Sequence, residues 1–323
     1  MSRNWGVPRF IGRRLALGIV TLFVVSLIVF TATQLLPSDP AQAILGRDAN
    51  PASTAALRTK LGLDHTAFYQ YTHWLKGVVT GNPGDSFNAQ APILSYIGDR
   101  VVNSLFLMFL ASLVSIPLSL LLGAYSARKR DTTFDNITSN AMLALASLPE
   151  FVVGIILVFI FSLRIWHVLP AVSAIGLGKG PWTDMKGMIL PTVTLAVGAI
   201  PYISRVVRAS MIEVLESDYV EMARLKGAPE KTVLWRHAMP NALGPVFQVI
   251  ALNIAYFAAG VIVVEALFNY PGIGGALRDS VRVRDIPVIQ FLVMVLAAVY
   301  VVTNLAADVA TVLVTPRLRT RMQ

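Results

Sequence analysis

Long apolar runs restrict the fold of this chain more than any other feature of its sequence. A helix needs about 20 consecutive apolar residues to cross the hydrocarbon core of a bilayer, and residues 15–36 supply a run of that kind. Five further runs follow at about residues 102–125, 140–163, 188–207, 242–264 and 288–314. The sequence therefore predicts an all-α polytopic membrane protein with six transmembrane helices.

Composition supports this class and excludes others. Hydrophobic residues make up 55% of the chain and charged residues only 14%, whereas a soluble domain carries about 25% charged residues. The absence of cysteine excludes a disulfide scaffold and thiolate metal sites. The net charge of +9 does not indicate nucleic-acid binding, because the basic residues gather at the ends of the apolar runs, as they do in membrane proteins.

The start of the chain, residues 1–36, is predicted to be a basic tail followed by a retained first helix. A cleaved signal peptide is the competing interpretation. The apolar run is long for a signal peptide, and residues 36–40 lack small side chains at a cleavage spacing.

Three further segments complete the predicted organisation: an extracytoplasmic insertion at 37–100, a core of five helices at 101–316, and a basic tail at 317–323. Basic residues favour the cytoplasmic side of a membrane, and short segments on the side of the N-terminus carry more of them than the loops opposite. We therefore expect both termini to be cytoplasmic and 164–187 and 265–287 to be external loops.

The insertion has its own folding signals. Pro51 to Ser53 is a helix start that extends through Leu61, and a turn cluster lies at 81–85. Between them, Thr66 to Val79 carries an apolar and aromatic stripe formed by Phe68, Tyr71, Trp74 and Leu75. These features predict a small folded cap that rests at the membrane interface.

The longest polar interruption in the second half of the chain is 216–240. Acidic residues precede basic ones in it, an order that suits the dipole of a short helix. Ser217 is placed to cap that helix, and Gly227 can end it, because glycine permits a left-handed backbone or a very close neighbour. Pro229 suits the first position of a second helix. The pattern predicts two short helices that form a docking surface; a plain connector between two spans is the alternative.

These residues resemble the EAA loop of permeases from ABC importers, in the spacing of Glu221, Ala223, Gly227 and Pro240. The chain departs from the general form at Met222, His237 and Met239, and its flanks resemble the variant of dipeptide and oligopeptide permeases. The resemblance implies a type I importer permease fold in which ATPase subunits contact a coupling helix at about 216–240. The residues implied in that contact are Asp218, Tyr219, Glu221, Ala223, Lys226, Gly227, Ala228, His237 and Pro240.

Other segments extend the resemblance to the peptide permeases. In the insertion these are LLPSDP (35–40), LGLDHTAFYQYTHWL (61–75) and GDSF (84–87), and 284–287 reads RDIP. The segment 268–275, FNYPGIGG, resembles the PGxG loop of that subfamily. Three glycines around a proline predict a turn and not a helix, so we expect an outer loop or gate at Phe268, Pro271, Gly272 and Gly274.

Polar residues within the apolar runs are candidates for the translocation path, because charge in lipid is costly. Glu150 follows Pro149, which is expected to kink its helix. It can line a path or pair with a partner subunit. Gln248 and Asn253 are weaker candidates. Asn304 and Asp308 lie four residues apart on one helix face and match an Asn-xxx-Asp pattern of the family, for which a structural role is favoured.

No catalytic motif is present in the sequence. Residues 176–180 lack both the spacing and the hydroxyl of a phosphate-binding loop, and neither HExxH nor GxSxG occurs. The four histidines are scattered, so no metal site is expected. We expect no enzyme activity and no cofactor in this chain, with ATP and magnesium on partner subunits.

The resemblance therefore implies one permease subunit of a peptide importer in the bacterial inner membrane. Its implied partners are a homologous second permease, two ATPase subunits and an external peptide-binding protein; the lipid bilayer surrounds it and nucleic acid is not involved. Relatives in this subfamily carry nickel chelates, haem or glutathione, so those substrates remain alternatives. A secondary transporter driven by an ion gradient, a membrane scaffold and a polypeptide-secreting channel are the rival classes.

Overall fold

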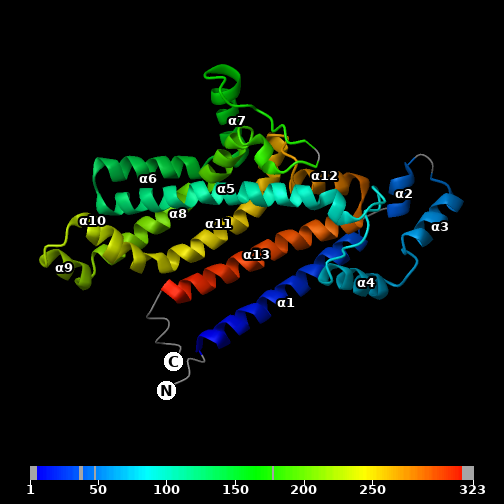
Figure 1. Cartoon of the computed structure of the whole chain (residues 1–323), viewed down its shortest axis with the longest axis horizontal. Coiled ribbons are helices and arrows are strands. Elements are labelled where there is room, and N and C mark those ends of the chain that lie inside the picture. Colours follow the sequence, from blue (N-terminus) through cyan, green and yellow to red (C-terminus); the bar gives the residue numbers. More distant parts are fainter. Residues whose placement is uncertain (1–5, 36–38, 47–48, 177, 315–323) are drawn as a thin grey trace.

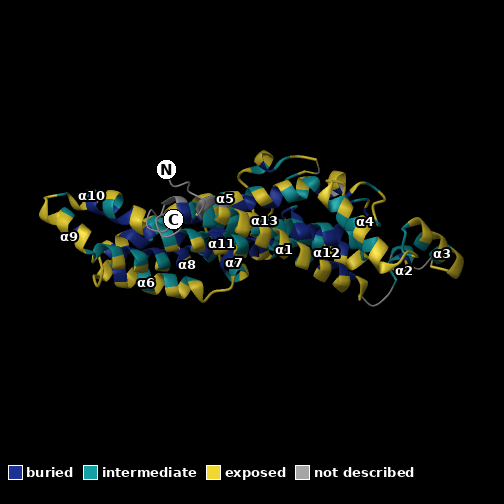
Figure 2. Cartoon of the chain, turned by 90° about the horizontal axis from the view of Figure 1, so that it is seen from below, coloured by how far each residue is buried: buried dark blue, intermediate teal, exposed yellow. Residues whose placement is uncertain are grey.

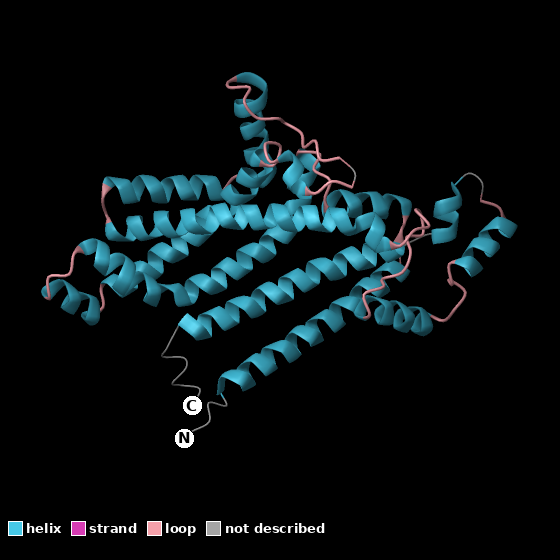
Figure 3. Ribbon diagram, in the orientation of Figure 1, coloured by secondary structure: helices cyan, strands magenta, loops and turns pink. Residues whose placement is uncertain are grey.

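The computed structural model describes residues 6–35, 39–46, 49–176 and 178–314. Within these residues the chain is helical, and no strand is present (Figure 3). The molecule is elongated, with the segment 216–240 at one end and the insertion at the other (Figure 1). Its helices are, in order, α1 (Gly6–Gln34), α2 (Pro40–Leu45), α3 (Pro51–Lys60), α4 (Ala67–Val79), α5 (Ile93–Arg128), α6 (Thr133–Ala146), α7 (Glu150–Val158), η2 (Phe159–Arg164), η3 (Pro181–Asp184), α8 (Ile189–Leu215), α9 (Asp218–Leu225), α10 (Glu230–Thr232), η4 (Val233–Ala238), α11 (Met239–Leu267), α12 (Ile273–Val283) and α13 (Ile286–Val314).

Five of the described helices are long and apolar enough to cross a membrane, and a bent pair makes a sixth if its two helices are counted as one span. The five lie in α1, α5, α8, α10–α11 and α13, and the sixth joins α6 to the α7–η2 helix. The apolar runs in the sequence therefore become helices at the predicted places, and the prediction of an all-α polytopic protein is confirmed.

The third span differs in shape from the expected kinked helix. The two helices meet at an angle of 102°, with a break of three residues between Ala146 and Glu150. Pro149 stands directly before α7 and does not lie inside a helix. Proline has no N–H to donate and restricts the residue before it to extended backbone, so the chain turns sharply here, and α7 projects from the bundle (Figure 1).

Helix α8 is the centre of the bundle. Of its most apolar window 61% is buried, against 17% for α1. Helix α5 approaches it closely at Gly123, where an added Cβ would lie 2.6 Å from the Ser204 carbonyl oxygen and from Val207 Cβ. Glycine thus permits a helix contact that a side chain would prevent. The outer helix α1 keeps an exposed apolar face (Figure 2), as expected of a surface that meets lipid.

Helices α1 and α13 pair along the edge of the bundle. Arg14 Nε lies 3.1 Å from Asp308 Oδ2, and Asn304 donates to the Tyr300 carbonyl one turn earlier in its own helix. Asp308 thus pairs within the chain, which supports the structural role favoured for it, since a carboxylate in an apolar span needs a partner.

The insertion folds as the helices α2, α3 and α4, with α3 and α4 at the predicted positions. Tyr71 and Trp74 pack their rings on Phe30 at the end of α1, with centroids 5.2 and 6.2 Å away. Phe68, predicted on the same stripe, is 77% exposed instead, because it lies one turn before this contact. On α3, Arg58 pairs with Asp39 and Asp64.

The insertion is fastened to the core at a point that joins two of the sequence motifs. Asp285 precedes α13 and is 2% exposed. Its carboxylate accepts hydrogen bonds from the Ser86 hydroxyl and from the N–H groups of Phe87 and Asn88, the latter two at 3.0 and 3.2 Å. The GDSF and RDIP segments, almost 200 residues apart in the sequence, thus form one contact.

Candidate functional site

The segment 216–240, which we call the hairpin, occupies one end of the molecule (Figure 1). Helix α9 ends in a Schellman motif: the Gly227 N–H donates to Arg224 O at 2.9 Å and the Ala228 N–H donates to Ala223 O at 3.1 Å. The motif requires a left-handed residue, and Gly227 has φ +79°. Of the two roles that glycine offers here, the structure shows the left-handed backbone, since an added Cβ would meet no described atom within 4 Å. The motif also explains the positions of Ala223 and Ala228.

Two details of the hairpin differ from the sequence analysis. Ser217 does precede α9, but its hydroxyl donates to the Val214 carbonyl and caps no N–H of the helix. Pro229 immediately precedes α10 and is not its first residue. In both cases the turn that leaves the preceding helix determines the backbone direction, which a local capping pattern does not encode.

One face of α9 presents apolar side chains to the surroundings. Tyr219, Met222 and Leu225 recur every three residues and are 41%, 56% and 76% exposed. Val220 on the opposite face is fully buried and anchors the helix to the bundle. Acidic Glu221 is exposed beside the apolar residues. An exposed apolar face with charge at its edge is characteristic of an interaction surface.

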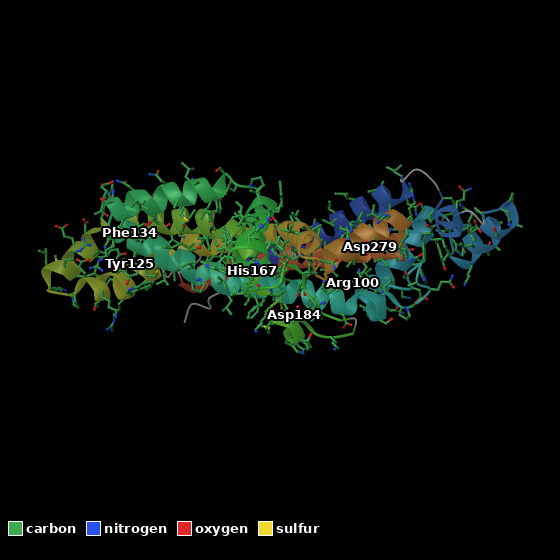
Figure 4. The ribbon with its side chains drawn as sticks, turned by 90° about the horizontal axis from the view of Figure 1, so that it is seen from above. Arg100, Tyr125, Phe134, His167, Asp184 and Asp279 are labelled. Atoms are coloured by element: carbon green, nitrogen blue, oxygen red, sulfur yellow. The ribbon has the colours of Figure 1, made fainter. Side chains whose placement is uncertain are left out.

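Ion pairs and ring contacts fix the hairpin on the bundle. Arg224 Nε lies 3.0 Å from Glu230 Oε1, which ties α9 to α10. Trp235 packs edge-on against Tyr125 of α5, with centroids 6.4 Å apart. Tyr125 lies at the same end of the molecule as Phe134 of α6 (Figure 4). The hairpin is therefore held by neighbouring helices while its outer face stays uncovered.

The remaining hairpin residues predicted in the contact lie on both sides of this face. Asp218 begins α9 and is exposed, and Lys226 follows α9 and is exposed. His237 is half-buried, and Pro240 is exposed in the first turn of α11. Because α10, η4 and α11 form one helix from Glu230 to Leu267, His237 and Pro240 share a continuous helix with the core.

The second predicted site, the outer loop, is organised by Glu265, which is 1% exposed at the end of α11. Its carboxylate accepts from the Ser104 hydroxyl and, at 2.6 Å, from the Gly274 N–H. Ser104 in turn accepts from the Ile273 N–H at 2.7 Å. A buried carboxylate thus satisfies the first turn of α12, as acidic groups do at helix starts.

Of the four loop residues predicted at the gate, Gly272 and Gly274 lie against this carboxylate. Phe268 is fully buried, and the carbonyl of Pro271 accepts from Asn103 at 2.8 Å. A Cβ on Gly272 would lie 2.0 Å from Glu265 Oε1. The expectation that the glycines of this segment stand outside a helix is wrong for Gly275 and Gly274, which lie in the first turn of α12. Gly274 packs against α11. There a Cβ would lie 2.6 Å from the Cα of a residue in α11, so the close packing of two helices explains the glycine.

Tyr270 closes the loop from inside. It is 2% exposed, and its hydroxyl donates to the Asn103 carbonyl at 2.8 Å. Burial raises the pKa of the Tyr270 hydroxyl above its ordinary value, so this donor remains protonated at neutral pH. Sequence analysis missed Asn103 and Ser104; the signal for them is a pair of polar residues within an apolar span.

Glu150 occupies a slot between α8 and α11. A Cβ on Gly198 would lie 2.8 Å from its Oε1, and a Cβ on Gly260 would lie 2.6 Å from its Oε2. Tyr256 interacts with the carboxylate, while Oε1 is covered and has no hydrogen-bond partner among the described residues. The two glycines therefore make room for an acid inside the bundle.

The other path candidates lie in different surroundings. Gln248 is exposed, whereas Asn253 is 5% exposed and donates to the Val249 carbonyl of its own helix at 2.9 Å. The three candidates therefore differ in burial and in hydrogen bonding. Across the described residues, no three His, Asp or Glu side chains lie close enough together to hold a metal ion.

Comparison with known proteins gives consistent results over the full length. Residues 115–320 match the family described as binding-protein-dependent transport system inner membrane component, and residues 7–117 match its N-terminal region. The probable peptide ABC transporter permease protein y4tP of Sinorhizobium fredii is 35% identical over 311 residues, which cover 96% of this chain and 99% of that protein. The glutathione transport system permease protein GsiC of Escherichia coli is 33% identical over 317 residues, which cover 98% and 99%.

Among solved structures, an amino acid ABC transporter with histidines gives a TM-score of 0.45 at 16% identity, over 68% of this chain and 92% of that one. The sequence matches alone establish the family. The predicted permease fold with its insertion and its hairpin between the fourth and fifth spans is consistent with them. The chain belongs to the family of inner membrane components of binding-protein-dependent transport systems.

Proposed function

We propose that this chain is one of two permease subunits of an ATP-driven importer for di- or oligopeptides. The exposed apolar and acidic face of α9 carries the proposal, because it is fixed in place by its own chain yet left uncovered. A partner that covers Tyr219, Met222 and Leu225 would remove apolar surface from water, which favours association. The similarity to a probable peptide permease over almost the whole chain supports the substrate class.

In this proposal the hairpin lies in a groove on an ATPase subunit. Glu221 pairs with a basic residue there, while Gly227 forms the tight turn that brings α10 back. The continuous helix from Glu230 to Leu267 then carries any displacement of the hairpin into the core as a rigid body. ATP and Mg²⁺ belong to two ATPase partners, and this chain contributes movement without catalysis or a cofactor of its own.

The orientation follows from that contact. The hairpin and both termini face the cytoplasm, and the insertion faces outwards, where an external binding protein delivers the peptide. A homologous second permease completes the path in the inner membrane. The peptide passes between the two permeases by alternating access, with Glu150 on the path and Gln248 and Asn253 as further contacts. Phe268, Pro271, Gly272 and Gly274 form part of the outer gate.

Glutathione is the second candidate substrate, since the GsiC permease of Escherichia coli is 33% identical over nearly the full length. Glutathione is itself a short peptide with free carboxylates. A competition assay decides between the two substrates. If an excess of glutathione abolishes uptake of a labelled tripeptide, and unlabelled tripeptides compete only weakly, glutathione is favoured.

The test is reconstitution of the chain with the products of neighbouring genes in proteoliposomes, followed by uptake of labelled di- to pentapeptides. We expect uptake that requires ATP and the binding protein. Uptake that follows a proton gradient and ignores ATP would contradict the proposal.

Gly227→Asp sharpens this test. The variant is expected to insert into the membrane normally but to separate ATP hydrolysis from uptake. The matched control is Gly81→Asp, because Gly81 has a similar φ of +77° against +79°, and an added Cβ would meet no described atom within 4 Å at either position. Normal transport by Gly227→Asp, or equal loss in both variants, would remove the support for the docking role.

A further inference from the structure

A cavity of about 670 Å³ lies between the insertion, the end of α1 and the junction of α12 with α13. Small-molecule sites typically have volumes of about 300–1,000 Å³. The cavity lies near the insertion, at the opposite end of the molecule from the hairpin (Figure 1). Asp285, whose carboxylate holds residues 86–88, follows the lining residue Arg284 directly, so the walls are joined across the fold.

The charge of the walls favours an anion. Arg58, Lys60 and Arg284 line the cavity, and among its described lining residues only Asp85 is acidic. Arg58 is engaged by Asp39 and Asp64, which raise the pKa of its guanidinium. Lys60 donates to Gln90 at 3.2 Å. Of these three cations, Arg284 therefore has the most hydrogen-bond donors left for a ligand.

Two lining side chains have a donor that is not used. Arg284 Nη1 and Trp74 Nε1 are both covered, and neither has a hydrogen-bond partner in the described part of the chain. Buried donors are rarely left unpaired, and two of them on one cavity indicate a site that receives an acceptor. Both nitrogens are covered in this structure, so a ligand in the cavity can use either donor only if that side chain rotates towards it.

The remaining walls suit an amide-rich ligand. The amides of Gln34 and Gln290 are held in place, because Gln34 donates to Gln70 at 2.9 Å and Gln290 donates to Thr33 at 2.7 Å. The ring of Phe30 adds an apolar surface beside Trp74. Fixed polar groups beside aromatic rings are typical of small-molecule sites.

We propose that this cavity binds a short peptide by its free C-terminal carboxylate, which accepts hydrogen bonds from Arg284 and Trp74. A guanidinium is suited to a carboxylate, because its planar N–H groups match the two oxygens. The peptide class rests on the function proposed above, whereas the preference for a carboxylate rests on the two donors. The permease thus holds a peptide site of its own, at the end that bears the insertion.

Calorimetric titration of the full chain in lipid nanodiscs tests this site, with trialanine as the probe. We expect trialanine and N-acetyl-trialanine to bind, because both keep the carboxylate. Trialanine amide is expected to bind about 10- to 100-fold more weakly, as loss of hydrogen bonds to a charged group predicts. Equal affinity for the acid and the amide would overturn the proposal.

Single substitutions locate the site. Arg284→Gln is expected to weaken trialanine binding about 10- to 100-fold, and Trp74→Phe about 2- to 10-fold. Arg282→Gln is the matched control for the first, because Arg282 is exposed in the last turn of α12, two residues before Arg284, and does not line the cavity. Trp182→Phe, at a tryptophan that is 64% exposed, is the control for the second. Affinities equal to those of the two controls would overturn the assignment.

ATP-driven uptake separates this proposal from the one it rests on. Carboxylate-dependent binding of trialanine without any ATP-driven uptake of peptides would leave the cavity assignment standing and remove the transport proposal. ATP-driven peptide uptake without trialanine binding to the chain in nanodiscs would support the transport proposal and overturn the cavity assignment. Weaker docking of the external binding protein to Arg284→Gln, with no peptide binding by the wild-type chain, would overturn the peptide site in favour of a protein contact.

Discussion

The hairpin follows α8, and residues 268–285, which we call the connector, join α11 to α13. The two segments are built from similar residues, but one exposes its apolar side chains and the other buries them. Both contain glycine and proline, and both hold a short helix. In the hairpin, Tyr219, Met222 and Leu225 are exposed. In the connector, Phe268 is fully buried and Tyr270 is 2% exposed. The hairpin leaves its apolar residues exposed, and the other segment covers them with its own chain.

The difference lies in where the polar groups find partners. The connector satisfies its backbone with the buried Glu265 and Ser104, so its stability depends on internal hydrogen bonds. The hairpin relies on the left-handed Gly227 and on the Arg224–Glu230 pair, both at the surface. We therefore expect substitutions in the connector to change stability, and substitutions on the hairpin face to change binding.

Glu265→Ala has the largest expected effect. It leaves the Ser104 hydroxyl and the Gly274 N–H without their carboxylate partner, and each unpaired buried group costs about 1–3 kcal/mol. Thermal unfolding of the purified chain in detergent measures the loss. Glu213→Ala is the control, because Glu213 is exposed. Equal unfolding temperatures for the two variants would show that the connector does not depend on this carboxylate.

Gly272→Ala comes next. Its Cβ would lie 2.0 Å from Glu265 Oε1 and 2.4 Å from Ser104 Oγ, and overpacking of this kind costs about 1–3 kcal/mol. Gly275→Ala is the matched control three residues later, since an added Cβ there would meet no described atom within 4 Å. Comparison of the two variants by the same thermal unfolding isolates the steric effect; a Gly272→Ala variant as stable as Gly275→Ala would contradict it.

Gly227→Ala probes the hairpin turn. An alanine in the left-handed conformation costs about 1–2 kcal/mol, confined to the hairpin because α9 and α10 can separate without opening the core. Hydrogen exchange at the hairpin amides should accelerate by about 5- to 30-fold. Gly98→Ala in α5, at a site free of described neighbours within 4 Å, should leave those amides unchanged. Unchanged exchange in Gly227→Ala would exclude the turn as the weak point.

Leu225→Ala has the smallest expected effect on stability and separates the two regions most clearly. Leu225 is 76% exposed, so unfolding should change by no more than about 0.5 kcal/mol. Binding to the ATPase subunits should weaken by about 1 kcal/mol or more, as truncation of an interface anchor does. Val79→Ala, at a site that is 78% exposed in the insertion, is the control. Equal pull-down of ATPase by both variants would contradict the docking face.

Much of the fold could be predicted, because apolar run length is a local property. The spans and the helices that begin at Pro51 and Ala67 follow from short stretches of sequence. The turn at Gly227 was predictable for the same reason. The prediction of a turn at Gly274 was wrong, because in sequence a glycine indicates a turn. The close contact with α11 that requires this glycine appears only in the structure.

The contacts of the candidate sites could not be predicted in the same way. Glu265 accepts from Ser104, 161 residues away, and Asp285 accepts from Ser86, 199 residues away; no local pattern records such a distance. The slot around Glu150 depends on Gly198 and Gly260, which belong to two different helices. Neither glycine alone indicates a contact with Glu150. Their shared position beside its carboxylate explains both.

The sequence by itself determined that the chain is a bundle of apolar helices with one polar hairpin of defined turn geometry, because hydropathy and glycine conformation act within a few residues. Only the tertiary structure decided which polar groups are satisfied internally and which remain for a partner. That outcome depends on distances between residues remote in sequence, and those distances exist only once the helices have packed.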